Sequence, residues 1–280
     1  MSKLCKQKTT VALSGEGADE LFGGYLTYRA NRISRNIRKM PRALTALGLA
    51  FFRRWPVSDE KLGFEYMATR LLEGSMMAPE FAHAYWNGTF AKEELNGLVG
   101  RPLPDSLTEV LDSLRRLPPV TDDLAPYLWL DQKYYLADDI LVKSDRMSMA
   151  HSVEVRPPFL DHRLVEFAAA LPASLKIRGS KQKFILKELM SDKLPPAILK
   201  RKKMGFDIPA HQWLRGPLRN LLEEAVNSGL REYGTFFQKE RILQLMERHF
   251  RREINVGYHL WGLLILFLWM KKWQVQVPAA

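Results

Sequence analysis

Hydrophobic and polar positions alternate along this chain mainly with the period of an α-helix. Only residues 9–13, Thr-Thr-Val-Ala-Leu, form the short β-branched and apolar run that is typical of a buried parallel strand, and Ser-Gly-Glu-Gly follows at 14–17. We expect helices over residues 18–23, 25–52 with a break at Pro41, 63–73, 79–86, 107–115, 124–137, 162–171, 183–194, 217–227, 238–252 and 257–273. The sequence therefore predicts an α/β chain that is mostly helical, with one recognisable parallel strand.

A single strand cannot form a sheet, so the strand at residues 9–13 needs neighbours. If the strand is central, those neighbours come from sequence before Met1 or from another chain. We therefore expect the chain to be the later part of an α/β domain that begins just before its last parallel strand. Within this partial domain over residues 1–280, residues 1–26 form a strand, loop and helix, and residues 27–280 form a mainly helical region with active-site loops.

The composition is that of an ordinary globular protein, with 46% hydrophobic and 26% charged residues. Cys5 is the only cysteine, so no internal disulfide can form, and no Cys/His cluster has the spacing of a zinc site. The most apolar run, residues 260–270, is shorter than the roughly 20 residues that span a bilayer, and two lysines follow it. We expect a cytoplasmic protein with no membrane partner.

The formal net charge of +11 attracts anions in general without identifying which anion. No acidic residue occurs between Glu20 and Asp59, and arginines recur there at helical spacing, at positions 29, 32, 35, 38 and 42. Such a stripe can contact the phosphates of nucleic acid. A basic helical nucleic-acid-binding protein is therefore an alternative function, which binding that depends steeply on salt and not on ATP would favour.

The segment SGEGADELFGGY, from Ser14 to Tyr25, carries the clearest candidate chemistry. A strand that ends in a Gly-containing turn and leads into a helix places backbone N–H groups at the carboxyl edge of a sheet, where α/β proteins bind phosphorylated ligands. Glu16, Asp19 and Glu20 would repel a bare phosphate, so their presence is explained if Mg²⁺ bridges them to it. The alternative is that Asp19 and Glu20 only complement the helix dipole while the glycines form a turn.

A second charged segment, residues 138–168, is otherwise apolar and rich in methionine, so its charges need partners. Lys143 and Arg146 are its candidates for contacting a phosphate. The remaining charges are expected to form a structural network at the double proline of residues 157–158, in which Glu154 and Arg156 pair with Asp161 or Asp145.

A third segment, residues 200–206, begins with four consecutive cations and continues into Gly-Phe-Asp-Ile-Pro at 205–209. A run of cations is usually a solvated surface, but this one leads into what looks like an ordered turn. A lysine on such a loop could close over a leaving pyrophosphate and stabilise its developing charge.

These segments together resemble the glutamine-dependent asparagine synthetases of the bacterial type. SGEGADELFGGY at residues 14–25, VKSDRMSMAHSVEVRPPFLDHRLVEFA at 142–168, KQKFILKEL at 181–189, LPPAILKRKKMGFDIP at 194–209 and HLWGLLILFLW at 259–269 follow in the family's order. The resemblance implies the C-terminal part of an adenine-nucleotide α-hydrolase-like (ATP pyrophosphatase) domain. It also implies an ATP-dependent amide ligase that adenylates aspartate, releases pyrophosphate and admits ammonia derived from glutamine, with ATP and Mg²⁺ required.

By position, the resemblance also implies roles for individual residues. Glu16 matches the family's key acid, which is needed to form the acyl-adenylate and is a candidate base when ammonia attacks. Lys203 matches the lysine that neutralises pyrophosphate and the adenylation transition state. The expected nucleotide contacts are Ser14, Gly15, Gly17, Lys143 and Arg146, the expected metal ligand is Asp19, and Asp139 and Arg201 are further candidates.

The departures from the family pattern shape the expected activity. Full-length members begin with a catalytic cysteine that belongs to a glutaminase domain, and Cys5 does not occupy that position. No SGGxDS-type pyrophosphate loop occurs in the 280 residues. We therefore expect a fragment, with little activity alone, whose glutaminase and phosphate-loop part is supplied in cis or in trans. A related amidotransferase that acts on another carboxylate, and a non-catalytic subunit, are alternatives.

Overall fold

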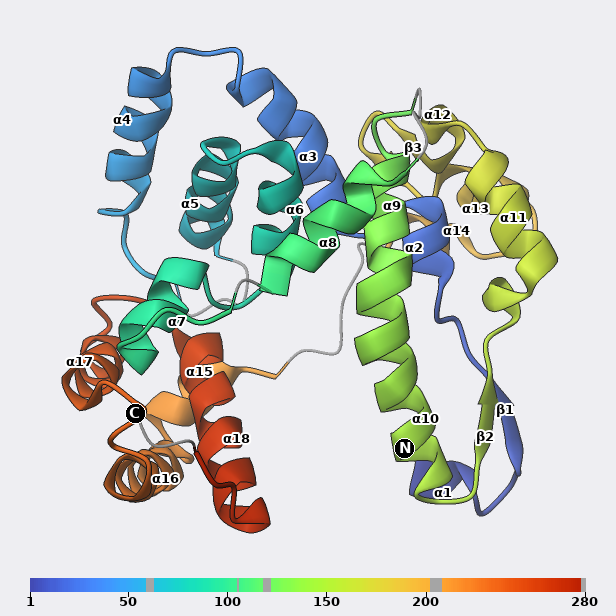
Figure 1. Cartoon of the computed structure of the whole chain (residues 1–280). Coiled ribbons are helices and arrows are strands. Elements are labelled where there is room, and N and C mark those ends of the chain that lie inside the picture. The colour runs from blue at the N-terminus through green and yellow to red at the C-terminus, as the bar shows by residue number, and fades with distance from the viewer. Residues whose placement is uncertain (59–62, 105, 118–121, 202–207, 278–280) are drawn as a thin grey trace. The chain divides into compact units, whose positions relative to one another are not determined.

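A computed structural model describes residues 1–58, 63–104, 106–117, 122–201 and 208–277 (Figure 1). The chain forms two compact units. Unit 1 comprises residues 1–32 and 108–203, and unit 2 comprises residues 33–107 and 204–280. The helices α3 (Leu26–Ile37) and α8 (Ser106–Arg115) each contain a boundary between the units. The division predicted at residue 26 remains a prediction.

Unit 1 contains a short parallel sheet made from two distant segments. The strand β1 (Val11–Leu13) pairs with β2 (Glu154–Arg156), with Val11 opposite Glu154 and Leu13 opposite Arg156 (Figure 1). The expectation that every neighbour of β1 comes from outside this chain, and that β1 is its last parallel strand, is therefore wrong. The expectation of a buried strand is also wrong, because Leu13 is 73% exposed. Its side chain faces away from the small clusters that form the core of the unit.

Unit 1 also contains an antiparallel hairpin of β3 (Ile177–Arg178) and β4 (Lys181–Gln182). Three helical segments run end to end as one rod in Figure 1: α9 (Ala125–Leu130), the π-helix η1 (Asp131–Leu141) and α10 (Val142–Met149). The remaining short helices are α1 (Ser2–Cys5), α2 (Ala18–Phe22), the 3₁₀ turn η2 (Pro158–Leu160), α11 (His162–Ala170), α12 (Ala173–Lys176), α13 (Phe184–Leu189) and α14 (Pro196–Lys200).

Two small apolar clusters hold unit 1 together around α2. Leu21 and Phe22 of α2 pack with Ala168 of α11. On the other side, Tyr28 packs with Ile177 and with the start of α9. The helix α2 itself also contacts α9, η1 and α13, so this five-residue helix is packed on several sides, which fixes the position of the turn that precedes it.

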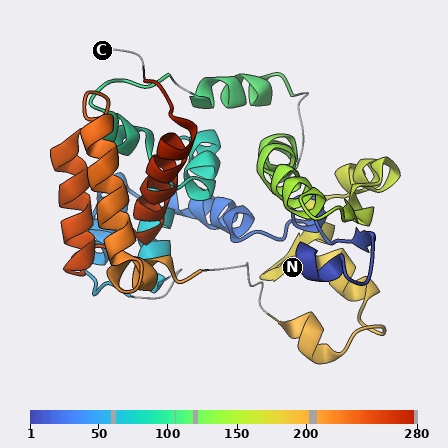
Figure 2. The same ribbon diagram turned by 90° about the horizontal axis from the view of Figure 1, so that it is seen from below.

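Unit 2 is all helical in the described residues, and its core lies around α18 (Gly257–Trp273). Figure 2 shows α16 (Arg219–Glu232) beside α18, and Gly229 allows the close approach because a Cβ there would lie 2.1 Å from Phe267 Cδ1. The other helices of the unit are α4 (Arg42–Phe52), α5 (Phe64–Ser75), α6 (Pro79–Asn87), α7 (Lys92–Val99), α15 (Ala210–Arg215) and α17 (Lys239–Phe250). Across the described residues, no helix has both the length and the apolar character of a membrane span.

Candidate active site

The turn after β1 is held against β2 and shaped by one glycine. The backbone N–H of Ser14 donates to the carbonyl of Arg156 at 3.1 Å, which continues the parallel ladder beyond the strands. Gly17 has a φ of 89°, and a Cβ there would lie 2.3 Å from Leu160 Cδ2. Because an L side chain rarely adopts that φ and Leu160 leaves no room, the chain needs glycine where α2 begins.

Two side-chain oxygens of this turn are shielded from solvent without a hydrogen bond. Ser14 Oγ and Glu16 Oε2 have no hydrogen-bond partner among the residues that the structure describes. Gly15 between them is exposed, and a Cβ there would meet no atom within 4 Å. Leaving a buried polar atom unpaired costs about 1–3 kcal/mol. A polar ligand or a bound cation would remove that cost, so the turn is suited to hold one.

Asp19, on the first turn of α2, forms an ion pair with a lysine from a distant hairpin. Lys183 Nζ lies 2.9 Å from Asp19 Oδ1, and the two side chains are only 25% and 14% exposed. The pair crosses directly over Gly24, where a Cβ would lie 1.8 Å from Asp19 Oδ1 and 2.4 Å from Lys183 Cε. Gly24 is thus required by close approach, and it allows a half-buried charge pair beside the turn.

A buried carboxylate lies behind this ion pair. Glu20 is 1% exposed, and burial raises its pKa although the Tyr25 hydroxyl donates to Glu20 Oε1 at 2.5 Å. Burial, together with Asp131 of η1, also raises the pKa of Tyr28 well above its usual value. Groups from α2, α3 and η1 therefore share one low-dielectric region, in which burial raises the pKa of both Glu20 and Tyr28.

The expected basic residues lie elsewhere in unit 1. Lys143 and Arg146 are exposed on α10, which contacts α1 and β2, and Figure 1 shows α10 at the opposite end of β1 from the turn. In residues 1–32 and the described part of 108–201, no hydrogen bond or ion pair joins them to residues 14–19. Asp139 on η1 and Arg201 after α14 are also exposed. Lys203 lies outside the described residues.

The network expected at the double proline has different pairings. Arg156 Nε lies 2.7 Å from Glu154 Oε1 of the same short strand, and both side chains are exposed. Asp161 caps α11 by accepting from the backbone N–H of Arg163 at 3.0 Å and pairs with its guanidinium at 2.8 Å. The expected pairing of Glu154 and Arg156 with Asp161 is therefore wrong. Residues in β2 that are two apart share a face, and Asp161 is an N-cap residue that serves its own helix.

Lys183, Tyr25 and Asp131 belong to this region, yet sequence reasoning did not single them out. Lys183 is one of three lysines in KQKFILKEL, and nothing in the local pattern distinguishes it from the other two. Tyr25 and Asp131 resemble ordinary helix-end residues. Only the tertiary structure brings the hairpin and η1 to α2.

The residues of the turn fit Mg²⁺ that arrives with a phosphorylated ligand. Over the described residues, no group of three or more His, Cys, Asp or Glu side chains comes together as a metal cage. Mg²⁺ usually takes one or two carboxylates and completes its octahedron with water and phosphate oxygens. Asp19 and Glu16, whose Oε2 has no hydrogen-bond partner in the described part of the chain, provide such carboxylates in the same turn as Ser14, so the donor set suits a metal bound together with its ligand.

Comparison with known proteins decides the family. The asparagine synthase family matches residues 1–274. The chain belongs to the asparagine synthase family. The resemblance expected from the sequence motifs is thereby confirmed. No solved structure matches, so the adenine-nucleotide α-hydrolase-like fold remains a prediction, while the mostly helical α/β class is confirmed.

Several known proteins are similar to this chain over most of its length. Glutamine-hydrolysing asparagine synthetase 1 of Bacillus subtilis strain 168 is 28% identical over 275 residues, which is 96% of this chain and 41% of that protein. A putative glutamine-hydrolysing asparagine synthetase of Mycobacterium bovis is 31% identical over 273 residues, covering 96% and 40%. Amidase chry2 of Gibberella zeae is 27% identical over 273 residues, covering 88% and 39%. The chain thus spans about two fifths of the length of these relatives.

Proposed function

We propose that this chain carries the synthetase site of an ATP-dependent amide ligase that forms asparagine from aspartate. The observation that carries the proposal is the pair of shielded, unpartnered oxygens on Ser14 and Glu16, in a Gly-containing turn at the end of a parallel strand. Family membership over residues 1–274 supports the same chemistry. The printed names of the relatives support glutamine as the source of the ammonia.

The proposed reaction has two steps. A side-chain carboxylate oxygen of aspartate attacks the α-phosphorus of ATP, the bond to pyrophosphate breaks, and β-aspartyl-AMP forms. Ammonia then attacks the acyl carbon and loses a proton, and AMP leaves with the electron pair of the broken C–O bond. The first step is needed because a carboxylate is a poor electrophile, whereas the acyl-adenylate has a good leaving group.

Each residue of the turn has a role in this proposal. Gly15 and Gly17 let the backbone approach the nucleotide, and the Ser14 hydroxyl donates to it. The Glu16 carboxylate accepts the proton that the attacking ammonia loses. Lys203, which lies outside the described residues, stabilises the charge that develops on pyrophosphate. Lys143 and Arg146 lie on α10 at the other end of β1 (Figure 1), so the proposal assigns them no contact with the nucleotide at this turn.

Asp19 is the proposed metal ligand. When bound, Mg²⁺ would neutralise part of the negative charge on the phosphates during adenylation. Asp19 is fixed for that purpose by its place on the first turn of α2 and by its ion pair with Lys183. The neighbouring Glu20 is oriented differently, since its carboxylate is buried and accepts from Tyr25.

The proposal includes a partner segment. The 280 residues contain no SGGxDS motif, so the α- and β-phosphates need a further backbone cradle. We infer that a polypeptide with that motif and a glutaminase part acts together with this chain, in cis or in trans. The chain assayed by itself then has little synthetase activity.

The test measures asparagine and AMP formed from aspartate, Mg·ATP and ammonium, with the chain alone and with the upstream part of the Bacillus subtilis relative added. We expect little product from the chain alone and equimolar asparagine and AMP from the mixture. Glu16→Gln should lower that rate by about 100-fold or more, which is the usual contribution of a general base. The control Glu166→Gln changes an exposed carboxylate on α11 and should leave the rate unchanged.

Two outcomes would contradict the proposal in different ways. Turnover by the chain alone that equals that of a complete ligase would show that no partner segment is needed. Full activity of Glu16→Gln in the mixture would remove Glu16 from the reaction. Absence of product in both arrangements would count against asparagine synthesis itself.

A second candidate is amide formation on another carboxylate. It is suggested by the similarity over 88% of this chain to a protein of Gibberella zeae that is named amidase chry2 and not asparagine synthetase. The same assay discriminates the two candidates when other carboxylic acids replace aspartate. AMP formation that requires a different acid would favour this second function.

A further inference from the structure

Lys183 adopts a backbone conformation that lysine seldom takes. Its φ of 51° and ψ of 41° lie in the left-handed region, immediately before α13. For a residue with a Cβ this conformation costs about 1–2 kcal/mol, and such residues cluster at functional sites where the surrounding structure holds them. The conformation directs the side chain across Gly24 to Asp19.

The hairpin that carries Lys183 is fitted closely to the end of α2. Gln182 Nε2 donates to the carbonyl of Tyr25 at 2.6 Å. Ile177 is 5% exposed, and a Cβ on Gly23 would lie 2.8 Å from Ile177 Cγ1. Because both ends of the hairpin are anchored to the segment after α2, the position of the Lys183 ammonium is determined by the fold rather than by the ion pair alone.

The ion pair leaves donors available on the lysine. An ammonium group has three N–H donors, and the ion pair with Asp19 Oδ1 at 2.9 Å occupies at most one of them. Among the residues that the structure describes, Asp19 is the only carboxylate within ion-pair distance of Lys183. A cation that is 25% exposed, and that pairs with Asp19 three residues after Glu16, can therefore donate to a second anion.

We propose that Lys183 is a phosphate-binding residue of this site, which donates to a phosphate oxygen of the nucleotide or of pyrophosphate and at the same time lowers the affinity of Asp19 for free divalent cations. The inference rests on the proposed function. The Lys183 ammonium then has two opposite effects. It attracts the polyphosphate, and it repels a metal ion that arrives without the polyphosphate. Metal and phosphate then bind together better than either binds alone.

The test compares Lys183→Met with Lys181→Met in the 280-residue chain. Lys181 lies in the same hairpin, is 65% exposed and pairs with Glu188 at 3.7 Å, so its substitution gives the same change in net charge. The probes are inorganic pyrophosphate with Mg²⁺, followed by calorimetry, and Mn²⁺ alone, followed by the loss of its free electron-spin resonance signal. Neither measurement depends on turnover.

Lys183→Met should weaken pyrophosphate binding about tenfold or more, which corresponds to one lost charge-assisted hydrogen bond. It should strengthen Mn²⁺ binding roughly threefold, since a neighbouring positive charge is removed. Lys181→Met should change both affinities less than twofold. Lys183→Gly serves as the folding control, because it removes the ammonium and also relieves the left-handed backbone.

Distinct outcomes overturn the two proposals. Equal effects of Lys183→Met and Lys181→Met, or weaker pyrophosphate binding with no gain in Mn²⁺ affinity, would overturn the role of Lys183. Recovery of pyrophosphate binding in Lys183→Gly would also overturn it. Pyrophosphate binding that follows the expected pattern in a chain that forms no asparagine with any partner segment would count against the proposed function alone. A wild-type chain that binds neither probe, both alone and with the upstream part of the Bacillus subtilis relative added, overturns both.

Discussion

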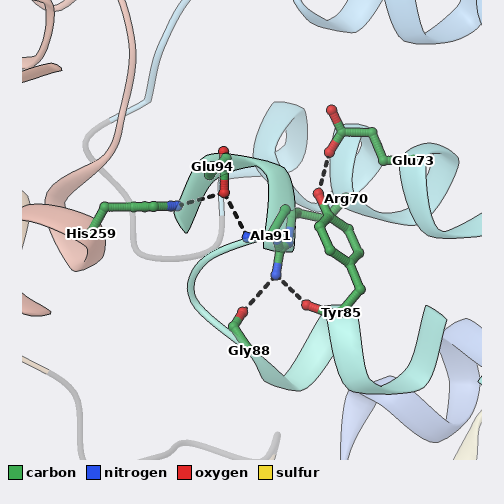
Figure 3. Close-up of polar contacts among 7 residues, drawn as sticks. All are labelled: Arg70, Glu73, Tyr85, Gly88, Ala91, Glu94 and His259. Atoms are coloured by element: carbon green, nitrogen blue, oxygen red, sulfur yellow. Dashed lines mark hydrogen bonds and ion pairs between the residues drawn. The ribbon is translucent and has the colours of Figure 1, made fainter. Parts of the chain in front are cut away.

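Each unit contains a cluster of charged side chains, and the two clusters use their polar atoms differently. In unit 2, Arg70 of α5 donates to the carbonyls of Tyr85 and Gly88, at 2.6 Å for Gly88, and its guanidinium lies 3.7 Å from the centre of the Tyr85 ring (Figure 3). The Tyr85 hydroxyl in turn donates to Glu73. These groups satisfy one another and hold the end of α6.

In unit 1, some polar atoms near α2 have no hydrogen-bond partner among the described residues. Ser14 Oγ and Glu16 Oε2 are shielded without a partner in the described residues, and the Lys183 ammonium meets a single carboxylate. A cluster that satisfies itself stabilises helices, whereas a cluster with shielded, unpaired atoms is suited to bind a ligand. The difference between these two sets of side chains indicates that the turn after β1 is the place to search for ligand binding, and that the Arg70, Tyr85 and Glu73 group stabilises its helices.

The largest expected effect comes from adding one methyl group to unit 1. Gly24→Ala would place a Cβ 1.8 Å from Asp19 Oδ1 and 2.4 Å from Lys183 Cε, so the ion pair has to separate. We expect pyrophosphate binding in the presence of Mg²⁺ to weaken more than tenfold, and the free energy of unfolding to fall by about 1–3 kcal/mol. Calorimetry and urea unfolding measure the two effects.

The matched control for this substitution lies in unit 2. A Cβ on Gly97 of α7 would meet no atom within 4 Å, so Gly97→Ala gains helix propensity of up to about 1 kcal/mol and should not change pyrophosphate binding. If Gly24→Ala binds pyrophosphate like the wild-type chain, the Asp19–Lys183 pair has no part in the site.

Much of the fold follows from local sequence. The break at Pro41 separates α3 from α4, and the last helix, expected over residues 257–273, is observed as Gly257–Trp273. The strand β2 was missed because its three residues include Glu154 and Arg156, which give no apolar run, and it exists only through its pairing with β1. The arginine stripe was expected to be able to contact nucleic-acid phosphates, yet one of its members, Arg38, donates to the carbonyl of Gly74 at 2.9 Å.

The candidate site divides in the same way. Residues 14–19 form one turn, so their proximity is determined by sequence alone. Lys183 approaches Asp19 only because the β3–β4 hairpin is anchored to the residues after α2, and no local pattern reports that anchoring. The π-helix η1, which brings Asp131 to this region, likewise has no periodicity that distinguishes it from an α-helix in the sequence.

Acidification should affect the two units in opposite directions. In unit 2, burial is the main cause that lowers the pKa of His249 from 6.5 to about 4, and the charge of Arg215 is the second. Between these two pH values the unfolded state therefore binds a proton that the folded state does not bind. Stability contributed by His249 is therefore present above pH 6.5 and is lost as pH falls toward 4, by up to about 3 kcal/mol. Glu20 in unit 1, whose pKa is raised by burial, contributes most at low pH and loses stability as pH rises above 4.5.

Hydrogen exchange followed by mass spectrometry between pH 7 and pH 4.5 measures each unit separately. Protection in unit 2 should fall, and His249→Gln should flatten that dependence. His151→Gln, which alters an exposed histidine of unit 1, should not change it. Loss of protection in unit 2 that persists unchanged in His249→Gln would assign the acid sensitivity to other groups.

Arg70→Met tests whether the cluster of unit 2 is purely structural. The variant loses the bonds to the carbonyls of Tyr85 and Gly88, and we expect the free energy of unfolding to fall by about 2 kcal/mol with pyrophosphate binding unchanged. Arg70→Lys should recover only part of the loss, because an ammonium cannot reproduce the planar fork. Arg115→Met, at a 76% exposed arginine, is the control and should change stability by less than about 0.5 kcal/mol. A binding defect in Arg70→Met would contradict the division of roles between the units.

The smallest expected effect concerns the edge of the same cluster, where His259 Nε2 lies 3.6 Å from Glu94 Oε2 (Figure 3). Glu94 also accepts from the backbone N–H of Ala91 at 2.7 Å, and glutamine can preserve that cap while removing the charge. Because Glu94 is 53% exposed, a double-mutant cycle of Glu94→Gln and His259→Gln at pH 5.5 should give a coupling below about 1 kcal/mol that disappears in 1 M salt. A larger coupling that salt does not reduce would mean that this edge is buried in solution, and that unit 2 also holds charges in a low-dielectric site.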